Sequence, residues 1–198
     1  MNIAVLTFEG FNELDSFIAS SIINRMKEFG WNVQITCPSE FVTSMNGVVV
    51  KAQQPLEFAN SADAVLFGSG VLTRAIAEDE NILSRLTLNP NRQLIGGQCS
   101  GTLLLSALGL LKNIPACTDL TTTPWVLESG VTVLNQPFFS KGNIATAGGC
   151  MSSQYLAAWC ISKLANKASA ESAIHYVAPV GEKEETVNRC MSVISTYL

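Results

Sequence analysis

QLIGGQCSGT, residues 93–102, runs directly into the apolar segment LLLSALGLL, residues 103–111. The first half predicts a short buried strand and the second half a helix, with a sharp turn at Cys99 between them. Residues 97–101 have the form G-x-nucleophile-x-G, in which Gly97 and Gly101 permit close backbone contact on either side of the cysteine. We therefore expect a nucleophile elbow with its sulfur at the tip of the turn.

A cysteine at such a tip is expected to be reactive. The first amides of the following helix point towards the sulfur and favour a thiolate. The alternative is a plain turn in which Cys99 is only a small buried apolar residue, and the motif alone leaves that alternative open.

Composition predicts one layered α/β domain over residues 1–198. The chain has 198 residues, of which 47% are hydrophobic and 14% charged, so most helices and strands must be covered on more than one side. Only 12 Lys and Arg and a net charge of −4 argue against nucleic acid as a partner. The N-terminus has no basic segment before an apolar one, and no apolar run is long enough to cross a membrane, so we expect a cytoplasmic protein without a membrane partner.

The six cysteines include no C-x-x-C pair, so reduced thiols are expected. One histidine and scattered cysteines give no zinc-ligand spacing, and we expect neither a metal nor a cofactor.

Periodicity predicts an alternation of strands and helices typical of a mostly parallel sheet. Asn46-Gly47 lies in a predicted hairpin over 41–51 at an edge of the sheet. Strands are expected at 2–8, 31–37, 63–67, 93–98, 131–135 and 143–146. Helices are expected at 13–29, 100–111, from 124 and at 151–166, with one or two short helices within 71–88 and one or two in the tail, including 186–197.

Candidate catalytic residues are few. His175, the only histidine, lies in an apolar stretch far along the chain from the elbow, which favours a structural or surface role and argues against a Cys-His triad. Asp15 follows the first strand, and so faces the same sheet edge as Cys99. Its role is either electrostatic, as an acid in the first turn of a helix, or catalytic, as a proton partner of the thiol. Gly68-Ser69-Gly70 after the third parallel strand exposes backbone amides at this edge, although the pattern alone favours an ordinary strand-to-helix turn.

Four landmarks together resemble the PfpI/ThiJ superfamily, which has a class I glutamine amidotransferase-like fold: the elbow 97–101, the end of its helix at 109–111, the opening 10–15 and Thr146-Ala147-Gly148-Gly149. The opening is most similar to the isonitrile hydratase branch. The resemblance implies a flavodoxin-like three-layer sandwich that acts as a homodimer on a small-molecule substrate.

By position, the resemblance implies that Cys99 is the nucleophile, that Asp15 is the acid, and that Gly70 and Ser100 bind substrate or stabilise developing negative charge. Asp119 stands where many relatives have histidine, and is a possible secondary site residue. Cys150 stands where a small or β-branched residue is more usual.

Three functions follow as hypotheses. The first is a cysteine-dependent hydratase or hydrolase-like enzyme that adds water to a small carbon-nitrogen substrate, with isonitrile to N-substituted formamide as the model. The second is a redox or stress-responsive protein that senses through oxidation of Cys99. The third is a non-catalytic ligand-binding domain of the regulator type.

Overall fold

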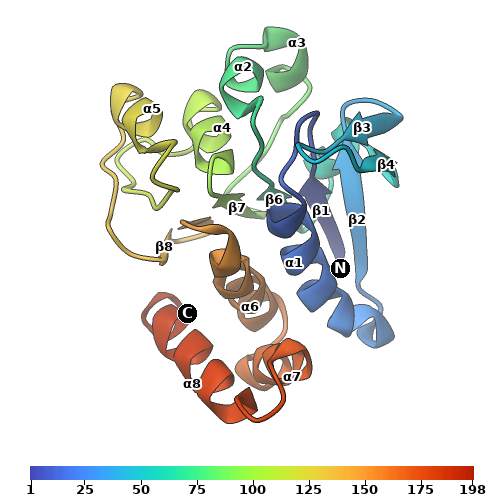
Figure 1. Ribbon diagram of the computed structural model, residues 1–198, viewed down its shortest axis with the longest axis vertical. Coiled ribbons are helices and arrows are strands. Elements are labelled where there is room, and N and C mark those ends of the chain that lie inside the picture. The colour runs from blue at the N-terminus through green and yellow to red at the C-terminus, as the bar shows by residue number, and fades with distance from the viewer.

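The computed structural model describes all residues, 1–198, and is built on a seven-stranded sheet (Figure 1). The strand order is β5-β2-β1-β6-β7-β9-β8, and every pair is parallel except β8 with β9. The strands are β1 (Asn2–Leu6), β2 (Asn32–Cys37), β5 (Gln54–Pro55), β6 (Ala64–Phe67), β7 (Leu94–Gln98), β8 (Phe138–Lys141) and β9 (Ile144–Ala147). This arrangement confirms the predicted flavodoxin-like α/β fold.

Helices cover both faces of the sheet, as the alternating side chains of β1 show. Ile3 and Val5 belong to one apolar cluster, and Ala4 and Leu6 belong to the other. The first cluster includes α1 (Glu13–Ile23), α6 (Ser153–Leu164), α7 (Lys167–Val177) and α8 (Lys183–Ile194), and the second includes η2 (Leu56–Asn60), α2 (Thr73–Ala77), α4 (Gly101–Ala107) and α5 (Thr123–Glu128). The remaining helical segments are η1 (Asn24–Phe29), α3 (Glu80–Leu83), η3 (Cys150–Ser152) and η4 (Ser195–Tyr197).

The helix α6 is covered on both sides, which explains its apolar sequence. It packs on the sheet with one side, and α7 and α8 cover the other (Figure 1). Trp159 at its centre is fully buried. None of the helices is both long and apolar enough to span a membrane.

Several predicted boundaries are wrong, and backbone geometry explains them. The helix predicted for 13–29 becomes a 3-10 helix after Ile23, and Gly30 ends it in the left-handed region at φ +78°. The elbow helix stops at Ala107 and not at residue 111, because Gly109 at φ +71° turns the chain away. The predicted strand 131–135 is only a single bridge between Ala116 and Val133, while β8 was missed.

The predicted hairpin is confirmed, as β3 (Phe41–Thr43) and β4 (Val49–Lys51), but it forms a separate two-stranded sheet. Its turn reaches the carboxyl end of the main sheet, where Ser44 bridges to Phe11 in the loop after β1. The hairpin therefore forms part of the surroundings of the site and is more than an edge decoration.

Candidate functional site

The elbow is present, and its backbone is strained at the predicted residue. Cys99 has φ +47°, one of only two positive values among non-glycine residues. A Cβ on Gly101 would lie 2.6 Å from the Phe67 carbonyl oxygen and 2.7 Å from that of Gly68, so the start of α4 can approach β6 only with glycine there. The Cys99 amide donates to the Ala147 carbonyl oxygen at 2.8 Å, which ties the elbow to β9.

Asp15 lies in the first turn of α1 and points into the protein. Asn12 caps this helix by accepting a hydrogen bond from the Leu14 amide at 3.1 Å. The Asp15 side chain is only 1% exposed; its Oδ2 accepts a hydrogen bond from the Ser69 hydroxyl, while its Oδ1 has no hydrogen-bond partner. Burial raises the pKa of the Asp15 carboxyl, an effect that Ser69 and two nearby thiols partly offset.

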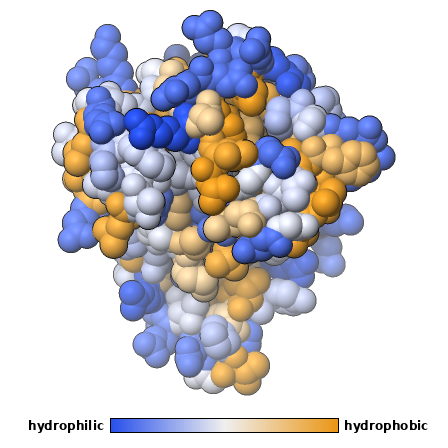
Figure 2. Space-filling model, turned by 45° about the horizontal axis from the view of Figure 1, so that its top comes forward, coloured by the Kyte–Doolittle hydropathy of each residue, from blue (hydrophilic) through white to orange (hydrophobic).

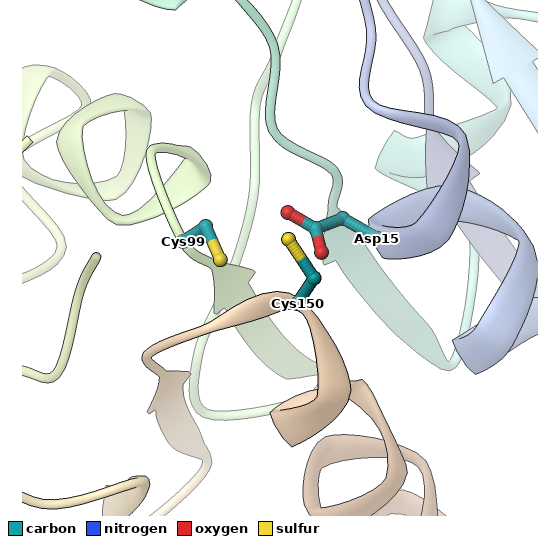
Figure 3. A group of neighbouring side chains, drawn as sticks. All are labelled: Asp15, Cys99 and Cys150. Carbon is teal, nitrogen blue, oxygen red and sulfur yellow. The ribbon is translucent and has the colours of Figure 1, made fainter. Parts of the chain in front are cut away.

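The second thiol beside Asp15 belongs to Cys150, which begins η3 just after β9. Figure 3 shows both sulfurs and the carboxylate directed into one shared space between three different elements. One ligand atom from each of Asp15, Cys99 and Cys150 lies within 4.8 Å of the other two. Asn12 Nδ2 donates to Cys150 Sγ at 3.3 Å, so the capping residue of α1 also positions the sulfur.

The electrostatics of this cluster correct the expectation of a thiolate at rest. Burial, the Asp15 carboxylate and Cys150 together raise the pKa of the Cys99 thiol far above its usual value. The pKa of Cys150 is raised by the same two main causes, burial and Asp15. Without a neighbouring cation the two thiols retain their protons, and the seven-residue helix α4 does not reverse this effect. The resting site thus holds two protonated thiols beside the Asp15 carboxylate.

Ser100 and Gly70 are in contact, chiefly through a hydrogen bond to the Ser100 side chain. The Gly70 amide donates to Ser100 Oγ at 3.1 Å, and Thr73 Oγ1 lies 2.9 Å from the same oxygen. This network joins the loop after β6 to the start of α4. The Gly70 amide is therefore occupied in the resting structure, whereas the Ser100 amide has no acceptor within the protein. Of the two predicted donors of a backbone N–H, Ser100 is the available one.

Asp119 lines the same pocket but uses its carboxylate locally. Its Oδ1 accepts from the amides of Thr121 and Thr122 at 2.9 and 3.0 Å, and its Oδ2 accepts from the Thr122 hydroxyl at 2.7 Å. These bonds organise the start of α5. His175, by contrast, is exposed on α7 and lies 3.7 Å from Glu184, so the histidine does not belong to the site.

A pocket of about 370 Å³ opens onto the cluster. Figure 2 shows apolar surface in the middle of one face, framed by hydrophilic side chains. Met45, Val71 and Trp125 give the pocket apolar walls. The residues lining it are Asn12, Asp15, Met45, Ser69, Gly70, Val71, Cys99, Ser100, Asp119, Thr121, Thr122, Trp125 and Cys150. It can hold a small molecule against Cys99.

Sequence reasoning missed Ser69 and Asn12 and did not assign a role to Cys150. The available signal was position: each follows a parallel strand at the carboxyl edge of the sheet, as do Asp15 and Cys99. Ser69 stands between the two glycines that were singled out for their amides, and Cys150 directly follows Gly148-Gly149.

The same cluster is the only close gathering of three possible metal ligands in the chain. Ligand spacing argued against zinc, but these donors come from three elements, so spacing along the sequence is a poor guide here. Two thiols and a carboxylate would leave the fourth position of a tetrahedral ion to water or substrate, and binding would displace the thiol protons. The expectation of a metal-free protein stays a prediction, which elemental analysis of purified protein tests.

Comparison with models of protein families assigns this chain to a known group. The model of the DJ-1/PfpI family matches residues 1–163. The chain belongs to the DJ-1/PfpI family. A comparison with curated protein sequences finds no significant match.

Solved structures of the DJ-1/PfpI family share the fold at low sequence identity. DJ-1beta of Drosophila melanogaster is 18% identical with a TM-score of 0.78, over 89% of this chain and 96% of that one. A ThiJ/PfpI family protein of Pseudomonas syringae is 19% identical with a TM-score of 0.76, over 98% of this chain and 87% of that one. Oxidized DJ-1 of Toxoplasma gondii is 20% identical with a TM-score of 0.72, over 89% and 97%.

Proposed function

We propose that this DJ-1/PfpI protein is a cysteine-dependent enzyme that adds water to a small carbon-nitrogen substrate, with an isonitrile as the model. One observation carries the proposal: the elbow sulfur of Cys99 and the buried carboxyl of Asp15 face each other across a pocket that has no imidazole. Burial raises the pKa of this carboxyl group and so makes its ionised form a stronger base, which suits it to accept the thiol proton and to return it to the substrate.

The chemistry needs only these two side chains and water. Asp15 takes the thiol proton as the Cys99 sulfur bonds to the terminal carbon of the isonitrile, and then gives that proton to the same carbon, which leaves a thioimidate. The carboxylate next accepts a proton from water, whose oxygen adds to this carbon, and returns the proton to nitrogen. Cleavage of the carbon-sulfur bond, with the hydroxyl proton passing back to sulfur, releases an N-substituted formamide.

The pocket supports substrates with a compact apolar substituent. The isonitrile carbon would lie at the floor near Cys99, and the substituent would extend between Met45 and Trp125. The Ser100 amide, which has no acceptor within the protein, could donate a hydrogen bond to negative charge that develops near the elbow.

The test is turnover of a panel of alkyl and aryl isonitriles, followed as formamide production. Cys99→Ala and Asp15→Asn are each expected to lower kcat/KM on the order of a thousandfold or more, with unchanged circular dichroism. Cys190→Ala, which removes a buried thiol outside the cluster, serves as the matched control and keeps wild-type activity. Retained activity in either site variant removes this assignment.

A redox role is the second candidate, and Cys150 is the specific observation in its favour. A single elbow cysteine would fit either function, but a second thiol at the same carboxylate is not needed for hydration. Stoichiometric oxidation of Cys99 in a peroxide titration, together with no turnover of any carbon-nitrogen substrate, would favour this candidate over the first.

We also propose that the protein acts as a homodimer in the cytoplasm. An apolar groove of about 610 Å³ lies along α1, lined by Leu14, Phe17 and Met151 among others. Leu14 and Met151 are half exposed or more, and a second copy of the chain would cover them. Light scattering over a range of concentrations tests the oligomeric state.

A further inference from the structure

The two thiols of the site are arranged for reaction with each other. Cys99 comes from the elbow after β7 and Cys150 from the turn after β9, and their sulfurs both point into the space beside Asp15 (Figure 3). They lie within 4.8 Å of one another, so only a short movement separates them from a bond of about 2 Å. All six cysteines are free, and this pair alone shares a carboxylate.

We propose that Cys99 and Cys150 form a dithiol site that reduces small hydroperoxides, with Cys99 as the attacking thiol and Cys150 as the resolving thiol. The proposal is independent of the hydration reaction proposed above. It rests on the placement of the two sulfurs and on the buried Asp15 carboxylate beside them, whose Oδ1 has no hydrogen-bond partner.

The first step oxidises Cys99. Its proton passes to Asp15, and its sulfur attacks one oxygen of the hydroperoxide, so that a sulfur-oxygen bond forms and the oxygen-oxygen bond breaks. The departing alkoxide, or hydroxide when the oxidant is hydrogen peroxide, takes the proton from Asp15 and leaves as an alcohol or water. Sulfur is oxidised by two electrons to a sulfenic acid, and the peroxide is reduced by the same two.

The second step joins the sulfurs. Cys150 attacks the sulfur of the Cys99 sulfenic acid, the sulfur-sulfur bond forms, and the sulfur-oxygen bond breaks. The hydroxide leaves with the proton of Cys150, as water. An external dithiol such as dithiothreitol returns the pair to two thiols. The disulfide protects Cys99 from further oxidation to sulfinic acid.

The surroundings of the two sulfurs differ in how closely they hold each cysteine. Gly148 is fixed, because a Cβ there would lie 2.4 Å from the Thr118 carbonyl oxygen. A Cβ on Gly149, at φ +86°, would meet only Ser152 Oγ, at 4.0 Å, although the Gly149 carbonyl oxygen accepts from Gln98 Nε2 at 3.0 Å. Cys150 follows this glycine and is only half-buried, whereas Cys99 is 4% exposed and held by its amide bond to Ala147. We therefore expect the more accessible Cys150 side chain to make the approach to Cys99.

The pocket gives a small oxidant access to the floor where both sulfurs lie. Hydrogen peroxide is close to water in size, and Ser69 and Asn12 provide polar groups beside the path. Cys37, Cys117, Cys160 and Cys190 are buried and line none of the principal pockets.

The experiment treats reduced full-length protein with stoichiometric hydrogen peroxide in the presence of a chelator, followed by intact mass and non-reducing peptide mapping. Wild type is expected to lose two hydrogen atoms and to yield a Cys99–Cys150 linked peptide, which dithiothreitol reverses. Cys150→Ser, whose hydroxyl can still accept from Asn12, is expected to gain oxygen at Cys99 and reach sulfinic acid. Cys190→Ala, the matched control, is expected to form the same link as wild type.

Catalysis is tested by peroxide consumption with dithiothreitol in excess. Wild type should exceed Cys150→Ser by about tenfold or more, since the variant stalls once Cys99 is overoxidised. Oxygen added to Cys99 of wild type while Cys150 stays free, or a disulfide through any other cysteine, overturns the proposal. Because the readouts are mass and peroxide, a failure here and a failure of isonitrile turnover are distinguishable.

Discussion

The cysteines of the pocket and those of the helical layer, formed by α6, α7 and α8, all have raised pKa values, yet their surroundings differ. Cys160 on α6 and Cys190 on α8 are fully buried, and burial raises the pKa of each to about 12. Cys99 and Cys150 also have raised pKa values, but both line a pocket and both adjoin the Asp15 carboxylate. Access and a proton partner, and not the resting pKa alone, separate a reactive thiol from an inert one.

Alkylation should show the largest difference between the two regions. Iodoacetamide is expected to modify Cys150 and Cys99 at least about a hundredfold faster than Cys160 or Cys190, because the helical-layer thiols react only after unfolding. The pocket rates should rise about tenfold for each unit between pH 7 and 9, since raised pKa values leave little thiolate at pH 7. Time-resolved peptide mass spectrometry measures each rate. Rates that are level over this pH range would show that the pocket thiols are already ionised.

Adding a methyl group should destabilise the protein more at the elbow than on the α6 side of the sheet. Gly101→Ala would drive a Cβ into two backbone carbonyl oxygens at the elbow and is expected to lower the free energy of unfolding by about 3 kcal/mol. Gly96→Ala is the matched control on the α6 side, where the Cβ meets the flexible ends of Leu156 and Leu66, and should cost about 1 kcal/mol. Urea denaturation measures both. Equal costs would contradict the close backbone approach at Gly101.

Ionisation of Asp15 should lower the free energy of unfolding, so this loss should appear as the pH rises. Because burial raises its folded-state pKa above the unfolded value, the folded protein binds more protons between the two values. Its contribution is full below the unfolded pKa and is lost as the pH rises through the folded one. Asp15→Asn should therefore raise the free energy of unfolding by about 1 kcal/mol at pH 8 and by less at pH 4.

Denaturation at both pH values measures the difference, and Asp119→Asn is the comparison. The Asp119 carboxylate is held by two amides and a hydroxyl, so its loss should destabilise the protein instead. An Asp15→Asn variant that is less stable than wild type at pH 8 would contradict the electrostatic account of the cluster.

Much of the fold and part of the site could be predicted from local pattern. The apolar run after Cys99 and the flanking glycines identified the elbow, and the edge rule placed Asp15 beside it. The protonation of Cys99 could not be predicted, since it depends on Cys150, fifty-one residues further along, and on how deeply the packed helices bury all three groups. Asn12 shows the same limit: its capping role is local, but its bond to Cys150 requires the tertiary structure.

Strands at the edge of the sheet were hardest to predict. The segment 131–135 has the apolar composition of a strand but makes one bridge only, whereas β8 pairs antiparallel with β9 and is decided by its neighbour. Composition indicates only that a segment is buried. Whether it pairs as an edge strand depends on which segment the tertiary structure places beside the unpaired backbone groups of the sheet edge.

Replacement of His175 should have the smallest effect of all. The ring is on the exposed side of α7, and its contact with Glu184 at 3.7 Å is a surface pair, so His175→Gln should change the free energy of unfolding by less than about 0.5 kcal/mol. Isonitrile turnover and peroxide consumption should also stay at wild-type values between pH 5.5 and 8, where an imidazole that takes part in catalysis would titrate. A pH profile of turnover that differs between the variant and wild type would mean that the helical layer does contribute to the chemistry of the pocket.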